Sequence, residues 1–106
     1  MAEFTEPLKA LAEGRTEPDS WLAWWAAHEA AVTAACPRGW LLRLLPRGGG
    51  PDDPLWTSRA VATSQAGACY VLDKLGVPAT RSARYTETYQ AEFARSGPRR
   101  SGVPRS

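Results

Sequence analysis

The sequence predicts an all-α protein, built as a compact bundle or array of four to five helices. Apolar residues recur at spacings of three and four in several segments, which is the period of an amphipathic helix. Prolines and glycines fall mostly between these segments, where helices begin and end. No segment alternates apolar and polar residues convincingly, as a half-buried strand would.

We expect the first helix over residues 5–13. Thr5 is the expected N-cap, because its hydroxyl can accept a hydrogen bond from a free backbone N–H of the first turn. Pro7 falls in that turn, where a missing N–H does no harm, and Gly14 is the expected end of the helix.

The second helix is expected over residues 19–35, with Thr16 as its N-cap. Its seven alanines favour helix, and Pro37 must end or kink it. One broad face collects residues at helical spacing: Trp21, Trp24, Trp25, His28, Val32 and Ala35. We expect the tryptophans to lie mainly in the core, because each can bury on the order of 200 Å².

Residues 40–45 are apolar almost all round, which predicts a short buried helix. A buried strand is the open alternative, because the period of so short a run does not decide between the two. Pro46 ends the run, and residues 48–51, which are Gly-Gly-Gly-Pro, predict a loop.

A long helix is expected from an N-cap at Asp52 or Asp53 to Leu75, with Gly76 ending it. Gly67 lies in the middle of this helix, where glycine costs about 1 kcal/mol relative to alanine. We therefore expect Gly67 to mark a close crossing with another helix.

The last helix is expected over residues 80–96. Tyr85, Tyr89 and Phe93 follow one another at spacings of four, so they stack along one face of it. The rest of this helix is polar.

The chain has 106 residues and a net charge of +2, which fits one domain and is too weak by itself to indicate a nucleic-acid partner. We expect a single helical domain over residues 1–97 and a disordered basic tail over 98–106. No signal peptide is visible, and the uncharged stretch 60–72 is too short to span a bilayer. A cytoplasmic protein without a membrane segment is therefore expected.

The residues that could carry chemistry do not resemble an active site. His28 is the only histidine, and Cys36 lies on the same helix, roughly 12 Å away by helical rise, too far for a catalytic dyad. Cys69 could approach His28 only through the tertiary fold. One histidine and two separated cysteines also fall short of a zinc site, which takes four ligands. We expect a protein that is not an enzyme and has no cofactor and no metal.

The last helix and the residues just before it carry the candidate partner-binding residues: Arg81, Arg84, Tyr85, Tyr89 and Phe93. Aromatic residues beside arginines are typical of protein interfaces. A core role for the three aromatic residues is the alternative. The sequence thus predicts a non-catalytic module that binds another protein.

Two other functions stay open. Arginines near the carboxyl end could bind nucleic acid weakly and in a salt-sensitive manner: Arg81, Arg84, Arg95, Arg99 and Arg100. Alternatively, the Trp-rich helix could pack on neighbouring molecules, which would make the chain a structural subunit of a larger assembly.

The segment Cys36-Pro37-Arg38-Gly39-Trp40-Leu41-Leu42-Arg43-Leu44-Leu45, which follows a helix rich in Ala and Trp, resembles a known family. This family consists of small helical bacterial proteins, described as immunity proteins of polymorphic toxin systems, and of related phage proteins. Its members usually have an Asp between the Gly and the Trp, whereas Gly39 here runs directly into Trp40. The resemblance covers residues 21–45 and implies an inhibitor or immunity role in a bacterial or phage conflict system.

Overall fold

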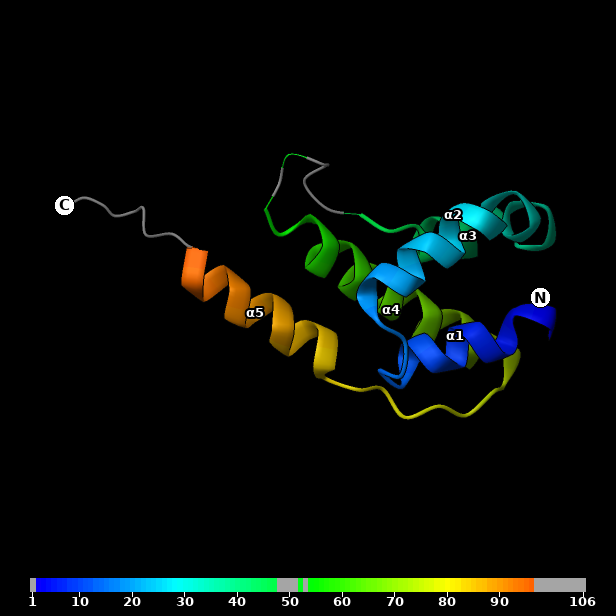
Figure 1. Ribbon diagram of the computed structural model, residues 1–106. Helices are drawn as coiled ribbons and strands as arrows, with labels where there is room; N and C mark the ends of the chain where they lie inside the picture. Colours follow the sequence, from blue (N-terminus) through cyan, green and yellow to red (C-terminus); the bar gives the residue numbers. More distant parts are fainter. Residues whose placement is uncertain (1, 48–51, 53, 97–106) are drawn as a thin grey trace.

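The computed structural model describes residues 2–47, 52 and 54–96. A short 3₁₀ turn, η1 (Ala2–Phe4), leads into five α-helices, and the described residues contain no strand. The helices are α1 (Thr5–Ala12), α2 (Pro18–Ala35), α3 (Arg38–Leu44), α4 (Trp56–Leu75) and α5 (Arg84–Ser96). The predicted all-α class with four to five helices is confirmed (Figure 1).

The central helix is α4, and α1, α2, α3 and α5 all pack against it (Figure 1). Its sequence allows this, because small residues occupy several of its buried positions: Ala60, Ser64, Gly67 and Ala68. Small side chains let the backbones of neighbouring helices come close. A single helix can therefore support four others.

Gly67 lies where α3 crosses α4 at close range. A Cβ at this position would overlap the backbone carbonyl of Arg43, which cannot rotate away as a side chain can. Beside it, the Ser64 hydroxyl donates a hydrogen bond of 2.9 Å to the carbonyl of Leu44, whose side chain is fully buried. The close crossing expected at Gly67 is confirmed.

The question left open for residues 40–45 is settled by α3, because residues 40–44 are helical and not a strand, and Leu45 is the C-cap of the helix. The expectation that this helix is buried is wrong, because Leu42 is 44% exposed. With seven residues, α3 turns one side to α4 and α2, and its other side faces solvent.

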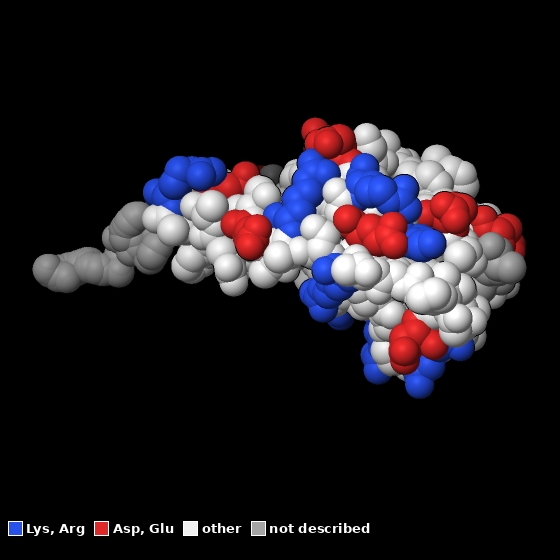
Figure 2. All heavy atoms as spheres, turned by 90° about the horizontal axis from the view of Figure 1, so that it is seen from below, with Lys and Arg blue, Asp and Glu red and all other residues white. Residues whose placement is uncertain are grey.

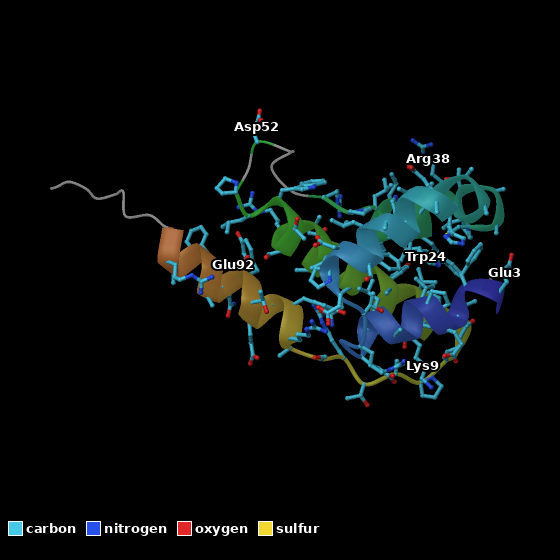
Figure 3. All side chains as sticks on the ribbon, viewed as in Figure 1. Glu3, Lys9, Trp24, Arg38, Asp52 and Glu92 are labelled. Carbon is cyan, nitrogen blue, oxygen red and sulfur yellow. The ribbon has the colours of Figure 1, made fainter. Side chains whose placement is uncertain are left out.

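The tryptophans of α2 lie mainly in the core, as expected. Trp21 and Trp25 are buried, and Trp24 is half-buried between α1 and α2 (Figure 3). The Trp24 ring stacks on Trp21 at 5.1 Å and on His28 at 4.4 Å between ring centroids, and Phe4 meets its edge at 6.0 Å. Edge-to-face and offset contacts of this kind add to the stability that burial provides.

The helices end as predicted at two glycines. Gly14 follows α1 with φ of 76°, and Gly76 follows α4 with φ of 73°. This left-handed region costs glycine little, whereas a Cβ makes it unfavourable for other residues. Glycine therefore marks these two boundaries correctly.

The predicted N-caps are wrong. Thr5 is the first residue of α1, because η1 runs directly into this helix and moves its N-cap to Phe4. In α2, Pro18 occupies the first turn and Glu17 is the extended N-cap, so Thr16 lies outside the helix. Neither cap makes a side-chain hydrogen bond.

The predicted start of the long helix is also wrong. Its first residue is Trp56, and its N-cap is Leu55, whose side chain is buried. Asp52 therefore precedes the helix, and Asp53 lies outside the described residues.

The segment 77–83 is not helical, so α5 starts four residues later than the predicted start at 80. This segment runs back along α1 (Figure 1). The Ser82 N–H donates to the Ala12 carbonyl at 2.9 Å, and the buried Gln65 amide donates to the carbonyls of Ala12 and Ser82 at 2.9 and 2.8 Å. Gln65 thus joins α1, α4 and the connection to α5. In residues 80–83 these hydrogen bonds take the place of the backbone hydrogen bonds that the predicted helix would have formed.

The loop expected at 48–51 and the basic tail expected at 98–106 lie outside the described residues. In the part of the chain that the structure describes, no helix is both long and apolar enough to cross a membrane.

Candidate protein-binding surface

The helix α5 packs on α4 at its start, and its last turns extend away from the rest of the molecule (Figure 1). Seen from below, it stands out from the body as a narrow arm (Figure 2). The three aromatic residues on its inner stripe are buried to very different degrees, and these differences define the candidate surface.

Tyr85, in the first turn of α5, belongs to the core. It is 1% exposed, and its hydroxyl donates a hydrogen bond of 2.5 Å to the carbonyl of Thr16. Burial raises the pKa of the Tyr85 hydroxyl above its usual value. The expectation that Tyr85 contacts a partner is therefore corrected, because its ring is not accessible.

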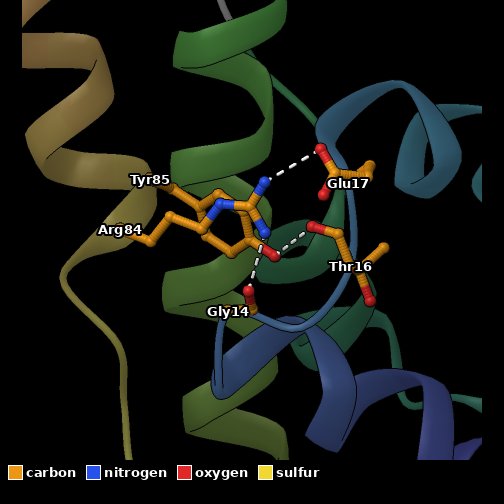
Figure 4. A network of polar contacts seen from close by, with 5 residues as sticks. All are labelled: Gly14, Thr16, Glu17, Arg84 and Tyr85. Carbon is orange, nitrogen blue, oxygen red and sulfur yellow. Dashed lines mark hydrogen bonds and ion pairs between the residues drawn. The ribbon is translucent and has the colours of Figure 1, made fainter.

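Arg84 fastens the same turn to the loop between α1 and α2 (Figure 4). Its guanidinium donates to the Gly14 carbonyl at 2.8 Å and forms an ion pair of 2.9 Å with Glu17. It also lies 5.5 Å from the centre of the Tyr85 ring. Arg84 is thus engaged within the chain, in contrast to the role in partner or nucleic-acid binding that the sequence suggested.

Tyr89, one turn further on, is half-buried against the first turn of α4. The Arg59 guanidinium lies 5.4 Å from the centre of its ring and donates to its hydroxyl at 3.2 Å. The hydroxyl of Ser58 donates a hydrogen bond to the carboxylate of Glu92, which joins the next turn of α5 to α4.

Phe93 is 46% exposed, and its ring centroid lies 6.1 Å from that of Tyr89. It is one of the two large apolar side chains exposed in the described part of the chain, and Leu42 on α3 is the other. We call Arg59, Tyr89 and Phe93 the α5 surface. Of the predicted partner-binding residues, the structure brings together Tyr89 and Phe93.

Arg81 is exposed in the segment before α5, separate from this surface. The sequence reasoning missed Arg59 as a member of this surface, because the residue of α4 that lies opposite Tyr89 depends on how the two helices are placed. It also missed the exposure of Leu42 on α3. Arg95 is exposed, and Arg99 and Arg100 lie outside the described residues. The face seen in Figure 2 carries interspersed acidic and basic side chains, which disfavours a strong nucleic-acid interface there.

The cysteines and the histidine make no reactive arrangement that the structure describes. Burial raises the pKa of both thiols, and in Cys69 it outweighs the opposing effect of Arg81, whereas a nucleophilic cysteine needs a lowered pKa. The Nδ1 atom of His28 lies 2.8 Å from the carbonyl oxygen of Trp24, which is hydrogen-bond distance within the same helix. Among the described residues, no group of three or more His, Cys, Asp or Glu side chains could hold a metal ion.

Compared with known protein families, with curated proteins and with solved structures, the chain matches none of them.

Proposed function

We propose that this chain is a non-catalytic protein-binding module that holds its partner through the α5 surface. The observation that carries the proposal is Phe93, a large apolar side chain 46% exposed on a helix that extends from the body. Tyr89 and Arg59 lie beside it. Tyrosine and arginine, together with exposed apolar rings, are the side chains that most often dominate binding energy in protein interfaces.

The way α5 is held supports the same proposal. Tyr85 and Arg84 fix its first turn, and Ser58 and Glu92 fix a later one. A surface held in place before binding loses less conformational freedom when the partner docks. Phe93 is thus presented at a defined position, because α5 is attached to the rest of the molecule at its first turn and again at Glu92, the residue before Phe93.

We extend the proposal to an inhibitor or immunity role in a bacterial or phage conflict system. This extension is supported by the resemblance of residues 36–45 to immunity proteins of polymorphic toxin systems, and by nothing in the geometry of α5. The partner would then be a toxin protein.

The test compares Phe93→Ala with Leu42→Ala, because Leu42 is exposed to nearly the same extent, at 44%, on a different helix. Proteins captured from the native host by the immobilised chain are identified, purified and titrated against both variants. We expect Phe93→Ala to weaken the complex by about 30-fold or more, the effect of losing an interface hot spot. Leu42→Ala should leave the affinity unchanged.

Circular dichroism melts of both variants show whether the fold is intact. If Leu42→Ala removes binding and Phe93→Ala does not, the partner binds at α3 and the α5 proposal fails. The proposal also fails if no captured protein distinguishes the Phe93 variant from the unmodified chain.

A further inference from the structure

A second surface lies on the opposite side of α4 from α1, along its solvent-facing stripe. Four residues of α4 follow one another there at spacings of three and four, and all are at least partly exposed: Thr63, Ala66, Tyr70 and Lys74. At its middle this stripe borders a cavity of about 370 Å³ between α3 and α4. We call this cavity the basic groove, and its walls are Arg43, Arg47, Thr63, Ala66, Gly67 and Tyr70.

The backbone under the groove is fixed. Thr63 accepts a hydrogen bond from the Arg47 N–H at 2.9 Å, and its hydroxyl lies 3.1 Å from the Arg47 carbonyl. At Gly67 the missing Cβ lets the backbone of Arg43 sit directly on α4. Arg43 and Arg47 therefore line the groove from backbone that contacts α4 directly.

Tyr70 holds the cations in place. The Arg43 guanidinium lies 4.2 Å from the centre of the Tyr70 ring, and the Lys74 ammonium lies 5.3 Å from it. Stacking on an aromatic face orients a guanidinium and leaves its N–H edge free to donate. That edge matches the two oxygens of a carboxylate.

The positive charge of the groove is not neutralised locally. Within the part of the chain that the structure describes, no carboxylate forms an ion pair with Arg43, Arg47 or Lys74. The single acidic residue of α4, Asp73, lines a different hollow with Val77. A ligand that carries negative charge would therefore meet Arg43 and Arg47 in the groove and Lys74 beside it, and no carboxylate of the described residues pairs with any of the three.

We propose that the basic groove is a binding site for an acidic protein segment, whose Asp or Glu carboxylates pair with Arg43 and Arg47. This site is separate from the α5 surface and does not depend on it. Single-stranded nucleic acid is the competing ligand, but it binds by stacking bases on open aromatic faces. The Tyr70 face is already occupied by cations of the chain itself, and the cavity has room for one or two side chains.

The test is a titration of the full chain with a fluorescent, end-capped peptide of alternating glutamate and serine, at low salt. The double variant R43Q/R47Q should bind this peptide about tenfold more weakly or worse, since two charge-assisted contacts are lost. The matched control is R38Q/R95Q, which removes the same charge from two exposed arginines elsewhere and should bind as the unmodified chain does. If the double variant does not fold, Lys74→Gln provides a milder change beside the groove, at the second cation on the Tyr70 ring, and should give a smaller loss of binding.

Three variants separate this proposal from others. Tyr70→Phe keeps the ring and should retain binding, whereas Tyr70→Leu should lose it. Phe93→Ala should bind the peptide normally, so a failure of the α5 surface leaves this test intact. The proposal is overturned if the two double variants bind equally, if the unmodified chain shows no binding, or if single-stranded DNA of equal charge binds more tightly through the same arginines.

Discussion

The two glycines inside helices, Gly39 in α3 and Gly67 in α4, should respond in opposite ways to the same substitution. A Cβ at Gly39 meets nothing within 4 Å. Gly39→Ala should therefore stabilise the protein by about 0.5–1 kcal/mol, because alanine loses less backbone freedom on folding. Gly67→Ala gains a similar stabilisation from the reduced loss of backbone freedom. It also places a Cβ against the backbone of Arg43, so α3 has to move away from α4.

The cost of that movement follows from what fixes α3. The fully buried Leu44 side chain is worth about 2 kcal/mol when buried, and part of this is lost as the helices separate. The hydrogen bond from Ser64 to the Leu44 carbonyl contributes about 1 kcal/mol more. Against the gain of about 1 kcal/mol from helix propensity, Gly67→Ala should destabilise the protein by roughly 1–2 kcal/mol.

Urea unfolding, followed by the fluorescence of the five tryptophans, measures both effects on one scale. The expected result is a midpoint above that of the unmodified chain for Gly39→Ala and below it for Gly67→Ala. A Gly67→Ala protein as stable as the unmodified chain would refute the close crossing. A Gly39→Ala protein that is clearly destabilised would refute the assignment of open space around Gly39.

Three further predictions concern single side chains. Tyr85→Phe should cost about 1 kcal/mol at neutral pH, because it leaves the Thr16 carbonyl without its partner. Since the folded pKa of Tyr85 is raised, its contribution is complete below the unfolded pKa of about 10 and is lost as the pH rises through the folded value. As the pH rises through this alkaline range, the melting temperature should therefore fall less steeply for Tyr85→Phe than for the unmodified chain. Parallel plots of melting temperature against pH would contradict the burial of the hydroxyl. Gln65→Leu should cost about 1–2 kcal/mol in chemical denaturation, because the Ser82 carbonyl loses its donor while the Ala12 carbonyl keeps the Ser82 N–H, and a change near zero would contradict the bonds assigned to Gln65. Phe93→Ala should change the free energy of unfolding by less than about 1 kcal/mol, close to Leu42→Ala, and a large loss would place Phe93 in the core.

Much of the fold could be predicted from the sequence, because helices are specified locally. Helical spacing and boundary residues located four of the five helices, whereas the period of residues 40–45 left helix and strand open, and Gly14 and Gly76 marked two helix ends. The N-caps at Thr5 and Thr16 could not be found in this way. The true N-caps depend on the turn that precedes α1 and on Pro18, and a threonine within two residues of a helix start resembles a cap in the sequence.

The candidate site could be predicted only in part, and α5 shows why. Tyr85, Tyr89 and Phe93 share one face, which their spacing predicts correctly. Their exposure nevertheless rises from 1% at Tyr85 to 46% at Phe93, because the end of α5 diverges from α4. Spacing along a helix gives the direction of a side chain, whereas burial depends on where the neighbouring helix ends.

The basic groove could not be predicted from the sequence for a related reason. Arg43 and Tyr70 are far apart in the chain, and they meet because Gly67 lets two backbones touch. The sequence identified the glycine and the crossing, but not which side chains the crossing would bring together.

The central position of α4 has a consequence for the order in which the chain can fold during synthesis. The helices α1, α2 and α3 leave the ribosome before the helix that covers much of their apolar surface, and the amide of Gln65 reaches the carbonyl of Ala12 across 53 residues. Until α4 has emerged, those earlier helices expose leucines and tryptophans to solvent or to any chaperone nearby. Completion of the core should therefore be a late and concerted event, which makes nascent chains truncated before residue 75 the form most prone to aggregate.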